Sequence, residues 1–356
     1  MNKRLSQLRT KMLEEKIPAL LITNPYNLRY MTGFTGTTGM ALVTANQAYF
    51  ITDFRYVEQA SEQCVGYEIV KNTGPIFEEI LPLLNKEEIA QLGFDDLHLS
   101  FAQYMELDDL LWDVDLIPVH GIIEGLREVK DESEIATIQE ACRIADAAFD
   151  HILGFIQPGM TEIEVANELD FFMRKQGASG VSFDTIVASG VRSALPHGVA
   201  SHKVIEKGDF ITLDYGCYYN GYVSDMTRTI SLGEPSDPVL KEIYDIVLQA
   251  HLKVEQEMKP GMTGKEVDAI ARDYIKEHGY GEQFGHSTGH GIGLEIHEHP
   301  MISMRSDAVL VEGNTVTDEP GIYLPGIGGV RIENDFLITK DGCQSFTTSP
   351  RELITL

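Results

Sequence analysis

The stretches QPGMTEIEVANELDFFMRKQG, from Gln157, and KPGMTGKEVDAIARDYIKEHG, from Lys259, repeat one pattern along the chain. Each begins with a Pro-Gly break, followed by a threonine, Thr161 or Thr263, that is suited to cap the start of a helix. An apolar run at helical spacing follows, and a glycine ends each copy. The pattern predicts two equivalent helices in two related parts of the molecule.

A second match follows at nearly the same offset. GDFITLDYG (208–216) aligns with GNTVTDEPG (313–321), so Asp214 and Glu319 occupy corresponding positions. One shared PGMT could arise by chance, but two successive matches in the same order are not expected from unrelated segments. We infer a duplicated domain in which each half supplies a carboxylate at the same place.

The composition indicates a globular protein with a strongly negative surface. The chain has 356 residues, of which 43% are hydrophobic, enough for one large or two ordinary cores. Lysine and arginine total 28 against 55 aspartate and glutamate residues, which gives a formal net charge of −27. Such a field repels phosphate backbones and anionic lipids, so we expect neither nucleic acid nor a membrane surface as a partner.

The cysteines and the N-terminus predict a cytoplasmic protein. The four cysteines are widely spaced and form no CxxC pair, which argues against a disulfide framework or a zinc ribbon. The opening MNKRLSQLRTKMLEEKI places its leucines among charges and lacks the apolar core of a signal peptide. No apolar run is long enough to cross a bilayer.

The order of expected elements predicts two domains. Apolar runs between turn residues indicate strands and a Leu- and Glu-rich run indicates a helix, at 19–23, 40–44, 48–52 and 76–85. These elements predict an α/β domain over residues 1–130. A polar stretch, GLREVKDES, then precedes an amphipathic helix expected over 134–156, which opens a second domain over residues 131–356.

The segment ITLDYGCYYNGYVSDMTRTIS predicts a β-hairpin, because Asn220-Gly221 is the strongest short hairpin signal. With these two residues as the loop, Asp214 lies opposite Thr227, two residues from Asp225. Asp214 and Asp225 then project from one face, with Cβ atoms roughly 5–8 Å apart. Two carboxylates this close repel and raise each other's pKa unless a cation lies between them.

The second half offers a similar pair in VTDEPGIYLPGIGGVRIENDF, where a Pro/Gly loop separates two expected strands. A loop of odd length places Glu319 and Glu333 on one face, although the sequence leaves that length open. A single acid on a strand is ordinarily a solvent-exposed residue. Paired acids on two hairpins that are related by a repeat favour a metal site instead.

Histidines gather in GHSTGHGIGLEIHEHP (285–300), which contains His286, His290, His297 and His299. His286 and His290 have the spacing of a zinc-binding helix, but the surrounding glycines would break such a helix and HExxH is absent. We therefore expect a glycine-rich loop that brings an imidazole close to a compact site. A histidine cluster alone is about as often a polar network as a metal site.

In their order along the chain, these motifs resemble the pita-bread metallopeptidases, specifically the Xaa-Pro dipeptidases (prolidases) and aminopeptidase P. The matching stretches between residues 182 and 335 are SFDTIVASGVRSALPHG, ITLDYG, SDMTRT, STGHGIGLEIHE, DEPGIY and GGVRIEND. NPYNLRYMTGFTG and FITDFRY resemble the creatinase-type N-terminal domain. The resemblance implies an α/β (α+β) protein, in which a creatinase-like α/β domain precedes a pita-bread catalytic domain with an internal pseudo-twofold repeat.

The resemblance also implies the metal ligands. Asp225 and Glu333 would bridge two ions, Asp214 would bind one of them, and His290 and Glu319 would hold the other. Four carboxylates and one imidazole suit Mn²⁺ or Co²⁺ better than a thiolate-bound zinc. We expect two divalent ions per chain, with Mn²⁺ favoured and Co²⁺ or Zn²⁺ as alternatives.

Catalytic roles follow from the same resemblance. Glu319 corresponds to the residue that moves a proton to the leaving proline nitrogen. His297 and His197 correspond to substrate-facing imidazoles that stabilise an oxyanion. Arg331 corresponds to an arginine that orients carboxylates or substrate, and an ion pair behind the ligands is an equal alternative.

Three positions depart from the family pattern. Asp318 stands where the residue before the ligand is usually apolar, and we expect it to face away from the metals. His299 occupies a position where HEEP-type members have glutamate. His202, near the first hairpin, has no counterpart that explains it.

The resemblance implies cleavage of the peptide bond before proline, in Xaa-Pro dipeptides for a first domain this short and in longer peptides for aminopeptidase P. A creatinase-like hydrolase and a non-catalytic peptide-binding module are alternatives, but both lack this ligand set. Methionine aminopeptidase needs no such first domain. A homodimer is implied by the family alone.

Overall fold

The computed structural model describes residues 2–356 and divides the chain into two compact units, Met1–Arg127 and Glu128–Leu356. Each unit has its own hydrophobic core. The boundary that the sequence suggested, after residue 130, lies three residues beyond this division.

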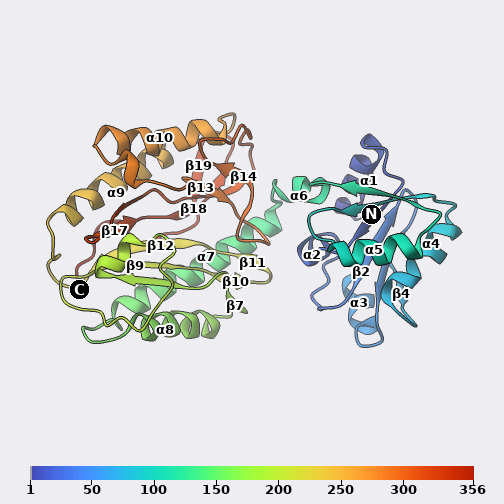
Figure 1. The fold of residues 1–356 in the computed structure, drawn as a ribbon, viewed down its shortest axis with the longest axis horizontal. Helices are drawn as coiled ribbons and strands as arrows, with labels where there is room; N and C mark the ends of the chain where they lie inside the picture. Colours follow the sequence, from blue (N-terminus) through green and yellow to red (C-terminus); the bar gives the residue numbers. More distant parts are fainter. Residues whose placement is uncertain (1) are drawn as a thin grey trace. The chain divides into compact units, whose positions relative to one another are not determined.

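The first unit is built on one mixed six-stranded sheet with the strand order β4-β3-β2-β1-β5-β6 (Figure 1). The strands β1, β2 and β3 pair antiparallel, whereas β4, β5 and β6 join the sheet in parallel. The three strands predicted around residues 19–52 are present. The strands span Ala19–Ile22 (β1), Met40–Thr44 (β2), Ala48–Thr52 (β3), Glu68–Lys71 (β4), Gln91–Asp95 (β5) and Asp115–Val119 (β6).

Six α-helices accompany these strands among residues 2–127, with α1 before the first strand and α6 after the last. Local sequence explains several of their ends: Asn24 caps α2 ahead of a proline, and Ser100 forms a capping box with Gln103 at the start of α5. The predicted helix over 76–85 is a short 3₁₀ turn that continues into α4. The helices span Lys3–Glu14 (α1), Pro25–Thr32 (α2), Val57–Gln63 (α3), Ile80–Lys86 (α4), Phe101–Leu110 (α5) and Ile122–Arg127 (α6).

The second unit contains two helix pairs, and Figure 1 shows α7 and α8 on one side of its strands and α9 and α10 on the other. As predicted, α8 and α10 begin after Thr161 and Thr263, and each threonine forms a capping box with the glutamate three residues on. The long helix expected from residue 134 is α7. The four helices span Glu132–Leu153 (α7), Glu162–Lys175 (α8), Val239–Glu257 (α9) and Gly264–Glu277 (α10).

The strands of the second unit form antiparallel sheets with the orders β12-β9-β8, β11-β10-β7, β14-β13-β15-β18-β19 and β16-β17. Strands of the first half span Gly180–Val181 (β7), Ile186–Ser189 (β8), Phe210–Tyr215 (β9), Cys217–Tyr219 (β10), Tyr222–Val223 (β11) and Met226–Ser231 (β12). Strands of the second half span Gly289–Gly291 (β13), Glu298–Ile302 (β14), Thr315–Asp318 (β15), Gly321–Leu324 (β16), Gly328–Arg331 (β17), Asn334–Ile338 (β18) and Cys343–Ser345 (β19).

Each half of this unit has an equivalent core. One core gathers apolar side chains of α7, α8, β9 and β12, and the other gathers those of α9, α10, β15 and β18. Each helix pair packs against the strands of its own half. The strand ends that carry carboxylates are not covered by these helices, so those of the two halves can face one another. The duplication read from the sequence is thus a duplication of structure.

The strand registers place the acidic residues as the hairpin argument required. Thr227 pairs with Asp214, and Tyr219 pairs with Tyr222 around a two-residue loop, which confirms the first predicted register. In the second hairpin, Leu324 pairs with Gly328 and leaves a loop of three residues. The loop therefore has an odd length. With an odd length, Glu319 and Glu333 project from the same face, as the sequence argument required.

Two further features concern membrane-spanning helices and cysteines. None of the helices formed by residues 2–356 combines the length and the apolar character needed to span a bilayer. All four cysteines are free, and three of them are buried.

Candidate metal centre

The five predicted ligands come together from five different segments. Asp214 lies near the end of β9, Asp225 directly precedes β12, and His290 is the central residue of β13. Glu319 follows β15, and Glu333 directly precedes β18. All five side chains line one cavity with a volume of about 550 Å³.

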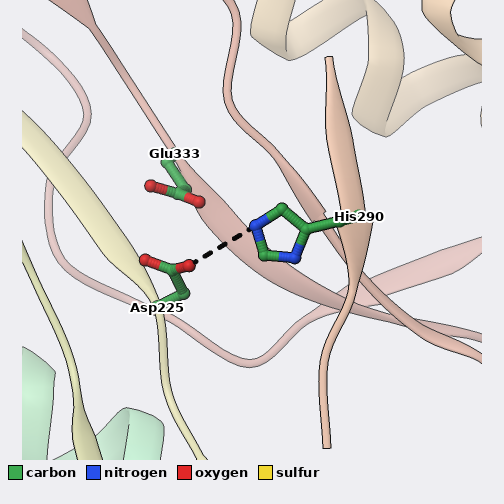
Figure 2. A group of neighbouring side chains, drawn as sticks. All are labelled: Asp225, His290 and Glu333. Atoms are coloured by element: carbon green, nitrogen blue, oxygen red, sulfur yellow. Dashed lines mark ion pairs between the residues drawn. The ribbon is translucent and has the colours of Figure 1, made fainter. Parts of the chain in front are cut away.

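Asp225, His290 and Glu333 form the tightest group, and Figure 2 shows their side chains pointing toward one another. One donor atom from each of these buried residues lies within 4.8 Å of the other two. The Nε2 atom of His290 is 3.7 Å from Asp225 Oδ2 and 3.4 Å from Glu319 Oε1. One imidazole therefore faces carboxylates from both halves of the unit.

His290 presents an unprotonated nitrogen to this group. Its Nδ1 atom lies 3.0 Å from the carbonyl oxygen of Gly291, and because a carbonyl only accepts, Nδ1 carries the proton. Burial lowers the pKa of His290 to about 4, so the ring is neutral near pH 7. Its Nε2 lone pair is thus available to a cation.

The carboxylates are buried close to one another, and this raises their pKa values. Burial raises the pKa of Glu319 to about 8. Burial, followed by the charges of neighbouring carboxylates, raises the pKa of Asp225 and of Glu333 well above the ordinary range. Burial also raises the pKa of Asp214, although the nearby Arg331 opposes that rise. Groups in this state are ones that a cation would hold in their ionised form.

Each half of the unit orients ligands of the other half. The backbone N–H of Asp225 donates to Asp335 Oδ2 at 2.9 Å. In return, the hydroxyl of Thr227 in the first half donates to Glu333 Oε2 at 2.6 Å. The site is therefore assembled only when the two halves are packed together.

The donor set fits divalent cations. Asp214 Oδ1 is buried and has no hydrogen-bond partner among the described residues, so one ligand oxygen remains available inside the cavity. Four carboxylates with one neutral imidazole are donors that Mn²⁺, Co²⁺ and Zn²⁺ all accept, whereas no thiolate lines the cavity among the residues described. Asp214, Asp225, His290, Glu319 and Glu333 are the residues that could hold such ions.

Arg331 is buried at the cavity wall, and each of its three guanidinium nitrogens donates a hydrogen bond within the protein. Its Nη2 donates to Asp214 Oδ2 at 2.5 Å, its Nε to Thr227 Oγ1 at 3.1 Å, and its Nη1 to Tyr323 Oη at 2.9 Å. Tyr323 Oη in turn lies 2.8 Å from Nε2 of His286. Sequence reasoning missed this chain because nothing in the pattern around Tyr323 indicates that its hydroxyl reaches an arginine on the neighbouring strand.

His197 and His297 both line the cavity, and both residues are exposed to solvent. The ring of His297 lies 4.4 Å from that of His290, centroid to centroid, and burial together with the charge of His197 lowers the pKa of His297. Around these imidazoles, the cavity wall is mainly apolar. The apolar lining residues are Phe183, Ile186, Pro196, Val199, Ile296 and Met301.

The three departures fall outside the cavity wall. Asp318 is fully buried and faces away from the ligands, as expected, and its Oδ2 atom lies 2.8 Å from Nδ1 of His251 on α9. His299 and His202 are exposed and are absent from the cavity lining formed by residues 2–356. Nothing in the structure explains His202.

Similarity to known proteins agrees with this geometry. Residues 136–340 match metallopeptidase family M24, and residues 4–129 match the Creatinase/Prolidase N-terminal domain. An Xaa-Pro dipeptidase from Bacillus anthracis is similar in structure, with a TM-score of 0.98, 58% identity and 99% of both chains covered. An X-Pro aminopeptidase from Thermotoga maritima is also similar, with a TM-score of 0.90, 44% identity, and coverage of 96% of this chain and 98% of that one.

A further relative is an Xaa-Pro dipeptidase from Pyrococcus horikoshii, which is 42% identical over 356 residues that cover 99% of each chain. These likenesses confirm the predicted family and the predicted succession of a creatinase-type domain and a pita-bread domain. The chain therefore belongs to metallopeptidase family M24 and is a hydrolase with a Creatinase/Prolidase N-terminal domain.

Proposed function

We propose that this hydrolase cleaves the peptide bond before proline in Xaa-Pro dipeptides, with two divalent ions held by Asp214, Asp225, His290, Glu319 and Glu333. One observation carries the proposal: four carboxylates and a neutral imidazole from two duplicated halves converge in one cavity. When bound, such ions polarise the scissile carbonyl and acidify the attacking water. Mn²⁺ is the favoured metal, with Co²⁺ and Zn²⁺ as alternatives.

Glu319 is the residue best placed to move a proton. It lines the cavity, and burial raises the pKa of its carboxyl to about 8 in the metal-free protein, so this carboxylate has a high affinity for a proton. Its Oε1 atom accepts a hydrogen bond from the hydroxyl of Thr317 at 3.5 Å and lies 3.4 Å from Nε2 of the neutral His290. We assign Glu319 the transfer of a proton to the departing proline nitrogen.

The imidazoles and Arg331 have separate tasks. His197 and His297 face the cavity and can donate N–H groups to an oxyanion that forms at the scissile carbonyl. Arg331 donates hydrogen bonds to Asp214, Thr227 and Tyr323. We therefore assign Arg331 the orientation of the Asp214 ligand rather than the binding of substrate.

The shape of the cavity supports a small substrate with an apolar ring. Apolar side chains, including Phe183, Ile296 and Met301, surround the polar centre and could pack against proline. Relatives of this chain include proteins named Xaa-Pro dipeptidase and one named X-Pro aminopeptidase, so both substrate lengths are represented among them. Aminopeptidase activity on longer peptides is the second candidate function.

Cleavage of Ala-Pro and of Ala-Pro-Ala in the presence of Mn²⁺ separates these candidates. We expect release of proline from Ala-Pro at a higher kcat/KM than cleavage of the tripeptide. Cleavage of the tripeptide alone would make the chain an aminopeptidase of the P type. Cleavage of neither peptide, by protein that contains two metal ions per chain, would refute the proposed function.

The cytoplasmic location and the homodimer also stay proposals. The four free cysteines support a reducing compartment, because none of them is paired. The family supports the homodimer. Size-exclusion chromatography with light scattering would measure the oligomeric state directly.

A further inference from the structure

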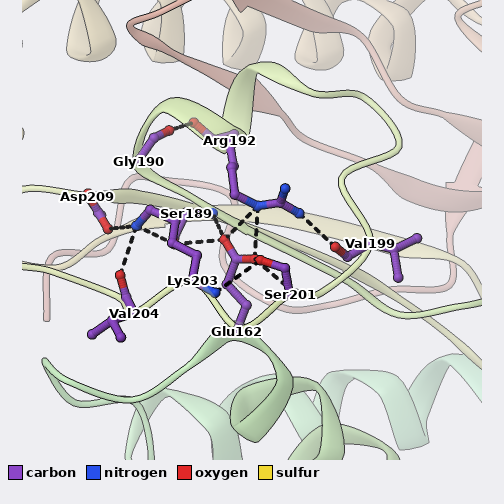
Figure 3. A network of polar contacts seen from close by, with 10 residues as sticks. Glu162, Ser189, Gly190, Arg192, Val199, Ser201, Lys203, Val204 and Asp209 are labelled. Atoms are coloured by element: carbon purple, nitrogen blue, oxygen red, sulfur yellow. Dashed lines mark hydrogen bonds and ion pairs between the residues drawn. The ribbon is translucent and has the colours of Figure 1, made fainter.

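Beneath the cavity wall, the carboxylate of Glu162 collects hydrogen bonds from three separate residues (Figure 3). Glu162 is the first residue of α8, is fully buried, and does not touch the cavity. Its Oε1 atom accepts from the backbone N–H and the hydroxyl of Ser189, at 2.8 and 2.9 Å. Its Oε2 atom accepts from the backbone N–H and the hydroxyl of Ser201, at 3.0 and 2.6 Å. Arg192 Nε donates to both oxygens, at 3.3 and 3.0 Å.

These contacts fix both ends of one chain segment. Ser189 ends β8 and Ser201 lies twelve residues later, so a single carboxylate ties together the two ends of the segment between them. Arg192 closes the middle of the segment, because its Nη2 donates to the carbonyl of Val199 at 2.8 Å. Figure 3 shows Arg192 between Glu162 and Val199.

The segment tied in this way contains His197. Pro196, His197 and Val199 are the part of the segment that lines the cavity. Within the described part of the chain, the ring of His197 makes no hydrogen bond, so no hydrogen bond from another side chain fixes its direction. The position of this imidazole therefore depends on the backbone of the segment, and that backbone depends on Glu162.

A second contact joins the segment to the metal-binding strands. Ser193, in the same segment, accepts the backbone N–H of Gly329 through its hydroxyl at 2.9 Å. Gly329 belongs to β17, the strand that ends at Arg331. A shift of the segment would therefore displace β17 near Arg331 as well as His197.

We propose that Glu162 is a positioning residue of the peptidase reaction and acts through His197. The inference rests on the proposed function. A charged carboxylate that accepts several N–H and O–H donors makes strong hydrogen bonds, and no neutral side chain of the same shape can accept all of them. Glutamine at this position would turn one acceptor atom into a donor that faces N–H groups. Misplacing a group that contacts the transition state by about 1 Å can cost on the order of 100-fold in rate.

The test is a double-mutant cycle between Glu162→Gln and His197→Ala, measured as kcat and KM on Ala-Pro with Mn²⁺. We expect Glu162→Gln to lower kcat/KM on the order of 10- to 100-fold, chiefly through kcat, while the metal content stays at that of the wild type. In the His197→Ala background, the same substitution should cost less than about 2-fold, because the group that it positions is already gone.

Glu164 provides the matched control. It lies in the same first turn of α8 and accepts the backbone N–H and the hydroxyl of Thr161 at 2.7 and 2.8 Å, but it is exposed and holds only the helix end. Glu164→Gln should lower the melting temperature and leave kcat/KM unchanged. Hydrogen exchange of residues 189–203 should rise in Glu162→Gln and stay at the wild-type level in Glu164→Gln.

The outcomes separate the two claims. If the two substitutions lowered kcat/KM independently, the factors of the single variants would multiply in the double variant. That result, together with unchanged hydrogen exchange of residues 189–203, would overturn the role of Glu162 and leave the proposed function standing. Wild-type protein that cleaves neither peptide would refute the proposed function and this inference with it. Should Glu162→Gln fail to fold, Glu162→Asp keeps the charge and shortens the reach, and the same cycle then applies to that variant.

Discussion

The two halves of the peptidase unit share a backbone plan but anchor their imidazole-bearing segments differently. The first half uses Glu162, whose counterpart in the repeat is Gly264. A side chain cannot stand at Gly264, because a Cβ atom there would lie 2.0 Å from the carbonyl oxygen of Met301. The second half places its buried acid one turn later on the helix, at Asp268, where the first half has Ala166.

Asp268 holds the segment that leads to His290. It accepts the hydroxyl of Thr288 at 2.8 Å and pairs with Arg272 at 2.6 Å. Arg272 in turn donates to the carbonyl of His286 at 2.7 Å. The two halves thus share their helix caps and the carboxylates Asp214 and Glu319, whereas the buried acid and the arginine that hold the loops lie at different positions.

Electrostatics differ between the halves as well. Asp214 and Glu319 are counterparts, but only Asp214 touches Arg331. Burial raises the pKa of Glu319 to about 8, and the charge of Arg331 opposes this rise without a direct hydrogen bond. Related strands thus carry one carboxylate that Arg331 holds by a hydrogen bond and one that it does not.

Loss of a bridging carboxylate from either half should have the largest effect. We expect Asp225→Asn and Glu333→Gln each to lower turnover by far more than the roughly 10- to 100-fold typical of residues behind a metal ligand, and to reduce the bound Mn²⁺. Under the proposed assignment, both residues contact both ions, so the two losses should be similar. Turnover of Ala-Pro and metal analysis of the purified variants measure this.

Matched controls exist in the two helix caps. Glu164→Gln and Glu266→Gln each remove an exposed capping carboxylate from one half and should leave turnover and metal content unchanged. Wild-type turnover in either bridging variant would contradict the assignment. A large loss in one bridging variant alone would show that the halves do not contribute equally.

The metal-free protein should become less stable as the pH rises. A carboxyl group whose pKa is higher in the folded chain than in the unfolded chain stabilises the fold at low pH, and this contribution is lost as the pH rises toward the folded value. The pKa of Glu319 rises from 4.5 to about 8, and that of Asp335 from 3.8 to about 7, in both cases chiefly through burial. The melting temperature should therefore fall between about pH 5 and pH 8, and added Mn²⁺ should raise it most at the upper end.

One variant in each half allows the pH dependence of the melting temperature to be compared between the halves. Glu319→Gln should flatten the fall in melting temperature more than Asp214→Asn. The charge of Arg331 lowers the pKa of both groups, but only Asp214 also accepts a hydrogen bond from Arg331, which lowers its pKa further. Differential scanning calorimetry of chelator-treated protein across the pH range provides the measurement. A metal-free wild type whose melting temperature rises steadily to pH 8 would contradict the cited pKa directions.

Local sequence was sufficient for much of the fold. The threonine caps of α8 and α10 and the Asn220-Gly221 turn act over a few residues, so their geometry could be read before any tertiary contact was known. The register of the first hairpin followed, and with it the shared face of Asp214 and Asp225. Resemblance to a family then supplied the complete ligand set.

Tertiary contacts account for what the sequence left open. A Pro/Gly loop is compatible with several turn lengths, so the three-residue loop before Gly328 became known only from the pairing of its strands. A glutamate at the start of a helix is ordinarily an exposed residue that favours the helix dipole, and nothing local distinguishes Glu162 from that case. Its burial depends on Ser189 and Ser201, which lie far along the chain.

The smallest effect concerns a position where the halves differ in polarity. Phe149 and Leu213 lie fully buried in the core of the first half. Their counterparts in the second half are His251 and Asp318, which are equally buried. Neither carboxylate oxygen of Asp318 has a hydrogen-bond partner among residues 2–356, although Asp318 Oδ2 lies only 2.8 Å from His251 Nδ1. Burial lowers the pKa of His251 to about 3 and raises that of Asp318, so both groups favour their neutral forms.

Replacing both His251 and Asp318 by the apolar residues of the first half should therefore change the free energy of unfolding little. Replacing only one of them should lower it. We expect His251→Phe or Asp318→Leu alone to cost about 1–3 kcal/mol, because each leaves one buried polar group without its neighbour. The double variant should lie within about 1 kcal/mol of the wild type, since replacing both partners of a buried pair by apolar groups is often neutral or stabilising. Melting temperatures of all four proteins with saturating Mn²⁺ measure the coupling, and turnover of Ala-Pro should persist because the Asp318 side chain faces away from the cavity. A double variant less stable than both single variants would mean that the polar pair is itself a source of stability in the second half.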